Sequence, residues 1–236
     1  MLVQLQDSTE EYLTMYVRSS SFSRYSIDLA VELGPFADEV TEALSTDAVF
    51  REVQRYGTGL VIFWSQSKNR LIVLPPFDIT EDRVVRGSPD TYLLNELLSK
   101  AYILGVVLVT WGSYAVGVFE GDALVESKTG TGYIHKRHRK GGRSEKRFAR
   151  RTVEQKNDFL RKVANRVEDK FSGYTLEKIF FGGNRLILKP LLEESHYLKY
   201  EAHHISNRFL NVRYADRDAL LKSLEDVNRS LIFRYQ

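Results

Sequence analysis

Hydrophobic and polar residues follow two different periods in the first third of the chain. Residues 10–18 (EEYLTMYVR) alternate enough to predict a strand, whereas residues 38–55 place apolar side chains near helical spacing. Residues 59–76 hold two apolar runs around a polar SQSKN turn, which predicts a β-hairpin. Residues 78–90 are polar and charged, so we expect a linker or an internal boundary there.

The pattern continues with a helix and a group of strands. Residues 91–103 (TYLLNELLSKAYI) gather leucines on one side of a predicted helix. Three or four short strands are expected next, and their close spacing predicts an antiparallel meander: GVVLVTW, SYAVGVF, ALVESKT and, as the fourth, GYIHK.

A long helix is predicted after the meander. Ser144 fits an N-cap, and the helix is expected over residues 145–171, with Phe148 and Ala149 in the core and Gly173 after its end. Four shorter elements are expected to follow: a strand at KIFFGG, a helix at LILKPLLEE, a strand at RFLNVRY and a final helix over residues 216–232. This order predicts an α+β fold in which helices flank a mixed sheet.

The composition fits a protein with a substantial core. Of the 236 residues, 43% are hydrophobic, which is enough for one large domain or two small ones. We expect residues 1–85 to form a smaller N-terminal α/β extension and residues 86–236 to form the main domain. The chain has no cysteine, which excludes disulfides and thiolate metal sites and favours a reducing, cytoplasmic compartment.

Neither a membrane span nor a signal peptide is expected. The longest apolar segment, residues 103–119, is interrupted by Gly105, Gly112 and Gly117, and it is better explained as two strands and a turn. The first residues (MLVQLQDSTEEYL) lack the basic start and apolar stretch of a signal peptide. We therefore expect no membrane partner.

Positive charge is concentrated in one short segment. Residues 136–151 contain nine Lys or Arg and a single acid, Glu145, which gives this segment a charge of +8 in a chain whose net charge is only +3. The rest of the protein is therefore mildly acidic. Such an uneven distribution favours a polyanionic partner.

The sequence around this segment resembles the middle domain of eukaryotic and archaeal class I peptide-chain release factors. Those domains carry glycine-containing strands, a basic loop of the form K-x-H-x-x-GGQS, an RFAR segment and a basic helix. Here VGVFEGDALVESKTGTGYIHKRHRKGGRSEKRFARR is followed by NDFLRKVANRVEDKF in the same order. The resemblance covers residues 105 to about 164. It implies an RNase H-like mixed sheet flanked by helices for the second half of the chain.

The layout is closest to one branch of that superfamily. The N-terminal third contains no decoding loop of the NIKS type, and we expect no third domain for a GTPase partner. In this the chain resembles the Vms-like release factors, which include the ankyrin-repeat zinc-finger peptidyl-tRNA hydrolase and bacterial members. The resemblance implies ribosome rescue, with the large ribosomal subunit and peptidyl-tRNA as partners, and neither DNA nor a cofactor.

The resemblance also implies which residues act on the ester that joins peptide to tRNA. In the release factors the catalytic Gln follows the two glycines directly, and here that position is Arg143. In some bacterial relatives the Gln lies two residues further, and here that position is Glu145. The implied catalytic set is Gly141, Gly142, Arg143, Ser144 and Glu145. The implied RNA-binding set is His135, Lys136, Arg137, His138, Arg139, Lys140, Lys146, Arg147, Arg150 and Arg151.

The chemistry of these residue types leaves two functions open. Consecutive glycines let the backbone approach RNA closely and present N–H groups to a developing oxyanion. Arg143 can only donate, whereas an ionised Glu145 can only accept and is either a general base or a first-turn acid favoured by the helix dipole. The chain is therefore interpreted as a slow peptidyl-tRNA hydrolase, with cleavage of the tRNA 3′ end as a second possible reaction. The alternative is a ribosome- or tRNA-binding module that has lost the glutamine.

Three other features have weaker functional interpretations. His196, His203 and His204 suggest a metal, but their spacing fits no zinc pattern and no carboxylate cluster accompanies them, so we expect none. The FGGNR segment lacks the spacing of a phosphate loop and predicts a strand-to-helix turn. Asp122 and Glu126 alone are too few acids for a two-metal nuclease.

Overall fold

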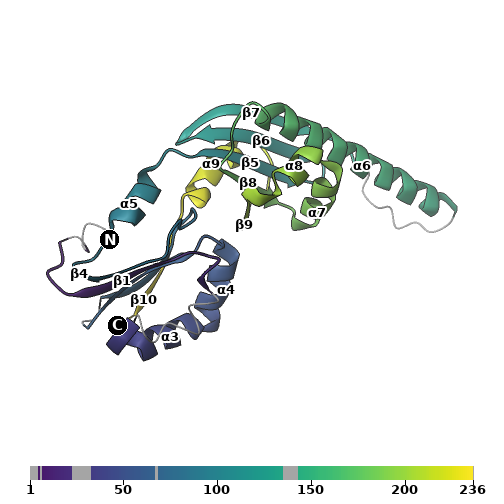
Figure 1. Ribbon diagram of the computed structural model, residues 1–236. Helices are drawn as coiled ribbons and strands as arrows, with labels where there is room; N and C mark the ends of the chain where they lie inside the picture. Colours follow the sequence, from purple (N-terminus) through teal and green to yellow (C-terminus); the bar gives the residue numbers. More distant parts are fainter. Residues whose placement is uncertain (1–4, 6, 23–32, 67–68, 135–142, 236) are drawn as a thin grey trace. The chain divides into compact units, whose positions relative to one another are not determined.

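The chain forms two compact units, which are described separately. A computed structural model describes residue 5 and residues 7–22, 33–66, 69–134 and 143–235 (Figure 1). Unit 1 comprises Met1–Lys100 together with Asn228–Gln236, and unit 2 comprises Ala101–Val227. The boundary expected after residue 85 falls inside unit 1.

Unit 1 is built on a five-stranded sheet whose neighbouring strands are all antiparallel. The strands, in the order in which they lie side by side, are β10 (Leu231–Tyr235), β3 (Arg70–Leu74), β2 (Leu60–Ser65), β1 (Tyr12–Val17) and β4 (Arg83–Gly87). The predicted strand at residues 10–18 and the predicted hairpin are confirmed. Residues 78–90 are not only a connection, because they contain the edge strand β4.

Helices cover both faces of this sheet, which explains why all six residues of β1 and of β2 are buried. The short helix η1 (Gly34–Phe36), α3 (Ala37–Ser45) and α4 (Asp47–Tyr56) pack on the face that includes Met15 and Trp64. The helix α5 (Tyr92–Ser99) packs on the opposite face through Leu94. The single helix expected over residues 38–55 is two helices, because Thr46 adopts an extended conformation between them.

Unit 2 is built on a five-stranded mixed sheet with the order β7-β6-β5-β8-β9. Its strands are β5 (Ile103–Thr110), β6 (Ser113–Glu120), β7 (Ala123–Thr131), β8 (Lys178–Gly183) and β9 (Ile205–Leu210). The first three form the expected antiparallel meander, and β8 and β9 then add parallel to β5. This is the RNase H-like arrangement expected from the sequence.

Helices also flank the sheet of unit 2 (Figure 1). On one face lie α6 (Arg143–Phe171), α7 (Arg185–Glu194), α8 (His196–Tyr200) and, after α8, the turn η2 (Ala202–His204). The helix α9 (Arg217–Val227) lies on the other face, where Leu220 approaches Gly117 of β6 so closely that a Cβ on that glycine would be 2.8 Å from Leu220 Cδ2. The glycine leaves room for the Leu220 side chain of α9 to pack directly against the strand.

Three sequence predictions near element ends differ from the structure. The final helix ends at Val227, and the last two residues expected in it, Leu231 and Ile232, begin β10 instead. The strand expected at residues 208–214 is shifted towards the N-terminus, as β9. Residues 132–134 do not continue the meander as a fourth strand, and the rest of the GYIHK segment lies outside the described residues.

Candidate nucleic-acid interface

The predicted site straddles the start of α6. Gly141, Gly142 and the cationic residues from His135 to Lys140 lie outside the described residues. Arg143, Ser144, Glu145 and Lys146 form the first residues of α6, which begins two positions before the expected start at residue 145. Arg147, Arg150 and Arg151 follow on the same helix and are exposed.

The strand that leads to the basic segment is fixed against α6. The Lys162 ammonium donates a hydrogen bond to the carbonyl oxygen of Thr131, the last residue of β7, at 2.9 Å. The next residue, Gly132, lies against the ring of Phe159, and its N–H donates to the carbonyl of Gly112 at 2.9 Å. The chain therefore leaves the sheet at a defined position.

Aromatic rings and a second lysine complete this anchor. The Phe159 ring lies 6.3 Å from the ring of Trp111 and 6.2 Å from the ring of Tyr114, measured between centroids. The Lys156 ammonium lies 4.5 Å from the Trp111 ring centroid, within the range of a cation–π contact. Sequence analysis missed these lysines. Lys156 and Lys162 lie three residues before and after Phe159, which places the three side chains on one side of the helix. This spacing is visible in the sequence and could have identified them.

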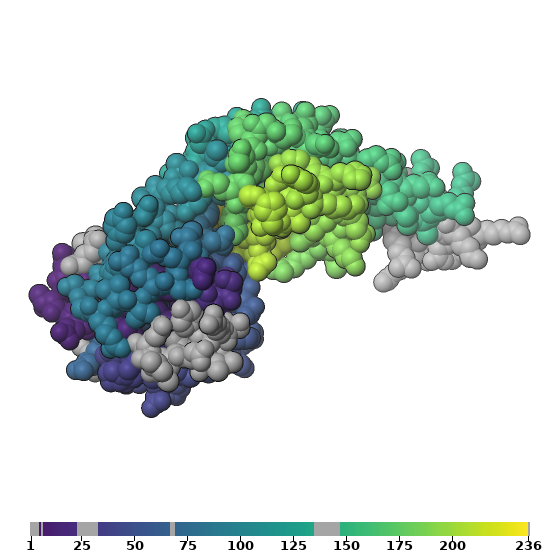
Figure 2. All heavy atoms as spheres, viewed as in Figure 1, coloured from purple at the N-terminus to yellow at the C-terminus, as the bar shows by residue number. Residues whose placement is uncertain are grey.

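The helix α6 extends beyond the sheet that supports its second half. Its buried stripe begins at Phe159 and continues to Phe171. Before that point Phe148 is 44% exposed and Val153 is 56% exposed. The expectation that Phe148 and Ala149 belong to the core is wrong, because both are exposed and none of the described strands covers the first turns of the helix. Figure 2 shows this part of α6 reaching away from the rest of unit 2.

The projecting part of α6 carries unneutralised positive charge. Arg147, Arg150 and Arg151 are spaced three and four residues apart, so they share one side of the helix. Within the described residues, no ion pair joins any of the three to an acidic side chain. Like charges at this spacing repel. A bound polyanion would relieve this repulsion, which makes this surface a candidate nucleic-acid interface.

Asp122 and Glu126, the two acids considered for a metal-dependent nuclease, do not lie together in the structure. The Glu126 carboxylate pairs with the Lys170 ammonium at 2.9 Å, and this hydrogen bond raises the pKa of Lys170. Asp122 lies in the turn between β6 and β7. Among the described residues these two acids belong to no group that is close enough to hold a metal ion.

The FGGNR segment is the strand-to-helix turn predicted for it. Gly183 ends β8 with φ +100°, and a Cβ there would lie 2.3 Å from the Val109 carbonyl oxygen. The Asn184 side chain then caps α7 by accepting a hydrogen bond from the Leu186 N–H at 3.0 Å. These contacts are structural and explain Gly183 and Asn184 without a phosphate ligand.

Within the part of the chain that the structure describes, no helix is both long enough and apolar enough to cross a bilayer.

An RNase H-like sheet whose third strand leads through a basic double-glycine segment into a long cationic helix defines a release-factor-type domain. Comparison with protein families supports this class directly. Residues 103–232, more than half of the chain, match the model of the Actinobacteria/chloroflexi VLRF1 release factor. The chain belongs to that family, and the release-factor superfamily expected from the sequence is confirmed.

Several solved structures are similar to this chain at low identity. The archaeal translation termination factor aRF1 aligns with 97% of this chain and 68% of its own, at 18% identity and a TM-score of 0.44. A structure described as the Vms1 mitochondrial localization core aligns with 80% of this chain and 84% of its own, at 15% identity and a TM-score of 0.40. Pelota from Archaeoglobus fulgidus aligns with 96% of this chain and 58% of its own, at 8% identity and a TM-score of 0.34.

Proposed function

We propose that this protein is a release-factor-like peptidyl-tRNA hydrolase that acts in ribosome rescue. The family match supports a role in termination or rescue at the ribosome. In this proposal the basic double-glycine segment enters the peptidyl transferase centre of the large subunit and frees the nascent chain from tRNA. Unit 2, Ala101–Val227, forms the catalytic domain in place of the residues 86–236 expected from the sequence. The protein acts in the cytoplasm as a member of the Vms-like branch.

One observation carries the proposal: the charged part of α6 projects from an anchored base. Lys162 and Phe159 hold the point where the chain leaves the sheet. Among the described side chains of α6 that precede Phe159, no large apolar one is buried. A rigid base with a cationic extension suits insertion among phosphates, because the extension can reach RNA while the base fixes its direction. A solvated charged helix with no partner would not need the anchor.

The residues of the segment can carry out ester hydrolysis. A water molecule attacks the carbonyl carbon of the ester, and Glu145 accepts the proton that the water loses. The N–H groups of Gly141 and Gly142 and the Arg143 guanidinium stabilise the negative charge that develops on the carbonyl oxygen. The bond to the ribose oxygen then breaks, and that oxygen takes up the proton.

A binding module without catalysis is the second candidate function. The observation that favours it is the sequence itself, since neither position 143 nor position 145 holds the glutamine of active release factors. Loss of one donor to an oxyanion typically lowers a rate by roughly 10²–10³. We therefore favour a slow enzyme over an inert one. Cleavage of the tRNA 3′ end remains the alternative reaction of the same segment.

The deciding experiment uses stalled ribosome–nascent-chain complexes. Purified protein is incubated with the complexes, and peptide release is followed on a gel that also resolves shortened tRNA. Gly142→Ala and Glu145→Ala are each expected to abolish release, while Gly173→Ala, at a glycine with open space around its Cβ position, leaves release unchanged. If the wild-type protein binds ribosomes in a salt-sensitive way but releases no peptide, the binding module is the correct function and the hydrolase proposal is wrong. Shortened tRNA in place of intact tRNA would assign the cleavage reaction.

A further inference from the structure

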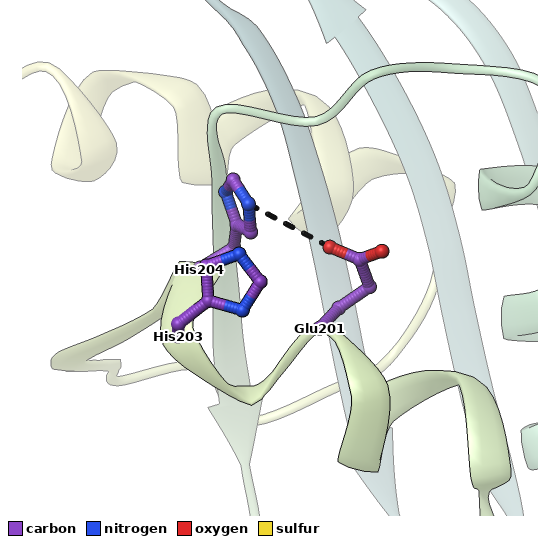
Figure 3. A group of neighbouring side chains, drawn as sticks. All are labelled: Glu201, His203 and His204. Carbon is purple, nitrogen blue, oxygen red and sulfur yellow. Dashed lines mark ion pairs between the residues drawn. The ribbon is translucent and has the colours of Figure 1, made fainter.

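Two histidines and a carboxylate converge at the turn between α8 and β9. Glu201 follows α8, and His203 and His204 belong to η2 (Figure 3). One ligand atom from each side chain lies within 4.8 Å of the other two. The Glu201 Oε2 and His204 Nε2 atoms are 3.7 Å apart, and the two imidazole centroids are 3.9 Å apart.

A hydrogen bond to the backbone orients His204 for binding. Its Nδ1 atom lies 3.2 Å from the carbonyl oxygen of Glu177. A carbonyl can only accept, so Nδ1 carries a proton, and in the neutral imidazole Nε2 then presents its lone pair to the side of Glu201. Histidines that bind metals in proteins are commonly held in this way by a carbonyl on their other nitrogen. The Glu177 carboxylate is fixed in turn, because it accepts a hydrogen bond from the Ile103 N–H at 3.0 Å.

We propose that Glu201, His203 and His204 bind a zinc ion. Two imidazole nitrogens and one carboxylate are ligands that Zn²⁺ favours, at about 2.0–2.2 Å, and three such ligands leave a fourth position for water. Ligand atoms of a tetrahedral site at these bond lengths lie about 3.3–3.5 Å apart. The 3.7 Å between Glu201 and His204 is close to this value. His203 is exposed, so the ion can reach the site from solvent.

The site is separate from the proposed hydrolytic centre. Strands β7, β8 and β9 all run in the direction of β5, since β7 and β5 are both antiparallel to β6. The basic segment follows the end of β7 at Thr131, whereas His204 directly precedes the start of β9 and Glu177 directly precedes the start of β8. The proposed zinc ion would therefore lie at the opposite end of the strands, where it would clamp the turn η2 beside the start of β8 and stabilise unit 2 without contributing to catalysis.

Sequence analysis found the histidines but no carboxylate to accompany them. Glu201 lies only two residues before His203, so the spacing is readable in the sequence, but the pattern matches no common zinc motif. The bend between α8 and η2 brings the three side chains to one side. Such a site depends on the local backbone conformation, which the residue types alone do not reveal.

The test is zinc binding to the full chain without a histidine tag, measured by isothermal titration calorimetry. We expect one strong zinc site per chain. Glu201→Gln and His203→Ala are each expected to weaken zinc binding, raising the dissociation constant at least tenfold. His196→Gln is the matched control, since His196 is exposed and begins α8, away from the three ligand atoms. A double variant, His135→Gln with His138→Gln, is also expected to retain the site.

Thermal unfolding provides a second measurement on the same proteins. Saturating zinc is expected to raise the Tm of the wild type and of His196→Gln, but not that of His203→Ala. Zinc binding that survives both Glu201→Gln and His203→Ala, or that is lost in the His135/His138 double variant, would overturn the assignment. So would a wild-type dissociation constant above 1 mM. Glu201→Gln is expected to leave peptide release unchanged, so failure of the zinc proposal can be distinguished from failure of the proposed hydrolase function.

Discussion

The ring of Phe159 occupies the space that any side chain at residue 132 would need. A Cβ built on Gly132 would lie 2.5 Å from Phe159 Cδ2, which is closer than side chains pack. Gly132 is the residue after β7, and Phe159 is the first residue of the buried stripe of α6. This contact joins the two ends of the segment that carries the proposed site.

Gly132→Ala is therefore expected to destabilise the protein by about 1–3 kcal/mol, because overpacking forces the ring or the backbone to move. Urea unfolding followed by circular dichroism measures the change. The matched control is Gly173→Ala, whose added methyl group meets no atom within 4 Å and which we expect to be neutral or slightly stabilising. Equal stability of the two variants would mean that Phe159 does not fix the base of the segment.

Replacing Arg147, Arg150 and Arg151 with Gln is expected to weaken binding to a short single-stranded RNA. Each lost phosphate contact reduces the slope of log affinity against log salt by about 0.7, so the slope should become shallower by about 2. The measurement is fluorescence anisotropy over a range of potassium chloride concentrations.

A control must remove the same charge elsewhere. Lys128, Lys189 and Lys222 are exposed lysines on β7, α7 and α9, and their replacement by Gln also removes three positive charges. This variant should keep the wild-type slope. If the slope of log affinity against log salt becomes shallower by the same amount in both triple variants, net charge governs binding and the projecting part of α6 has no special role.

The parts of the fold that sequence analysis predicted are those in which burial leaves a local signal. The apolar strands of both sheets and the helical stripe from Phe159 to Phe171 were readable because each pattern reports directly on a covered face. Phe148 continues the same stripe but is exposed. Helical periodicity shows which side of a helix is apolar, whereas the length of the sheet beneath it depends on strands elsewhere in the chain.

Long-range pairing was the other source of error. Leu231 pairs with Leu74 of β3, so the last strand belongs to a sheet formed mainly by residues far earlier in the chain. The end of α9 at Val227 is fixed by the buried Arg208 guanidinium, which donates to the carbonyl oxygens of Asp226 and Val227. Leu74 and Arg208 are both distant in sequence from the residues they contact. The local hydrophobic pattern does not contain this information, and it therefore predicts a helix that continues too far.

Arg143→Gln restores the GGQS order of active release factors. We expect this change to raise the rate of peptide release roughly 10²-fold, because an amide can both donate to the oxyanion and accept from the attacking water. Single-turnover release from stalled complexes measures it. Glu145→Gln is the matched comparison and is expected to lower the rate, since the amide cannot take up a proton. The opposite result would assign the glutamine position of this chain to residue 145 and would remove Glu145 as the base.

Tyr16 is expected to make folding sensitive to alkaline pH. Its side chain is fully buried, its hydroxyl donates to the Asp90 carbonyl at 2.7 Å, and burial is the main reason that its pKa rises from 10.0 to about 12. Because the folded protein holds this proton more tightly than the unfolded chain, the stabilisation is complete below pH 10. It is lost as the pH rises towards 12, by about 2–3 kcal/mol in total.

Tyr16→Phe isolates this contribution from other groups that titrate at high pH. The variant should be less stable at pH 8 by about 1–3 kcal/mol, because the Leu94 N–H and the Asp90 carbonyl lose their partner. The gap between wild type and variant should then narrow between pH 10 and 12, since only the wild type loses the stabilisation. Urea unfolding at pH 8, 10, 11 and 12 measures the gap. A gap that stays constant to pH 12 would show that the hydroxyl ionises in the folded protein as readily as in the unfolded chain.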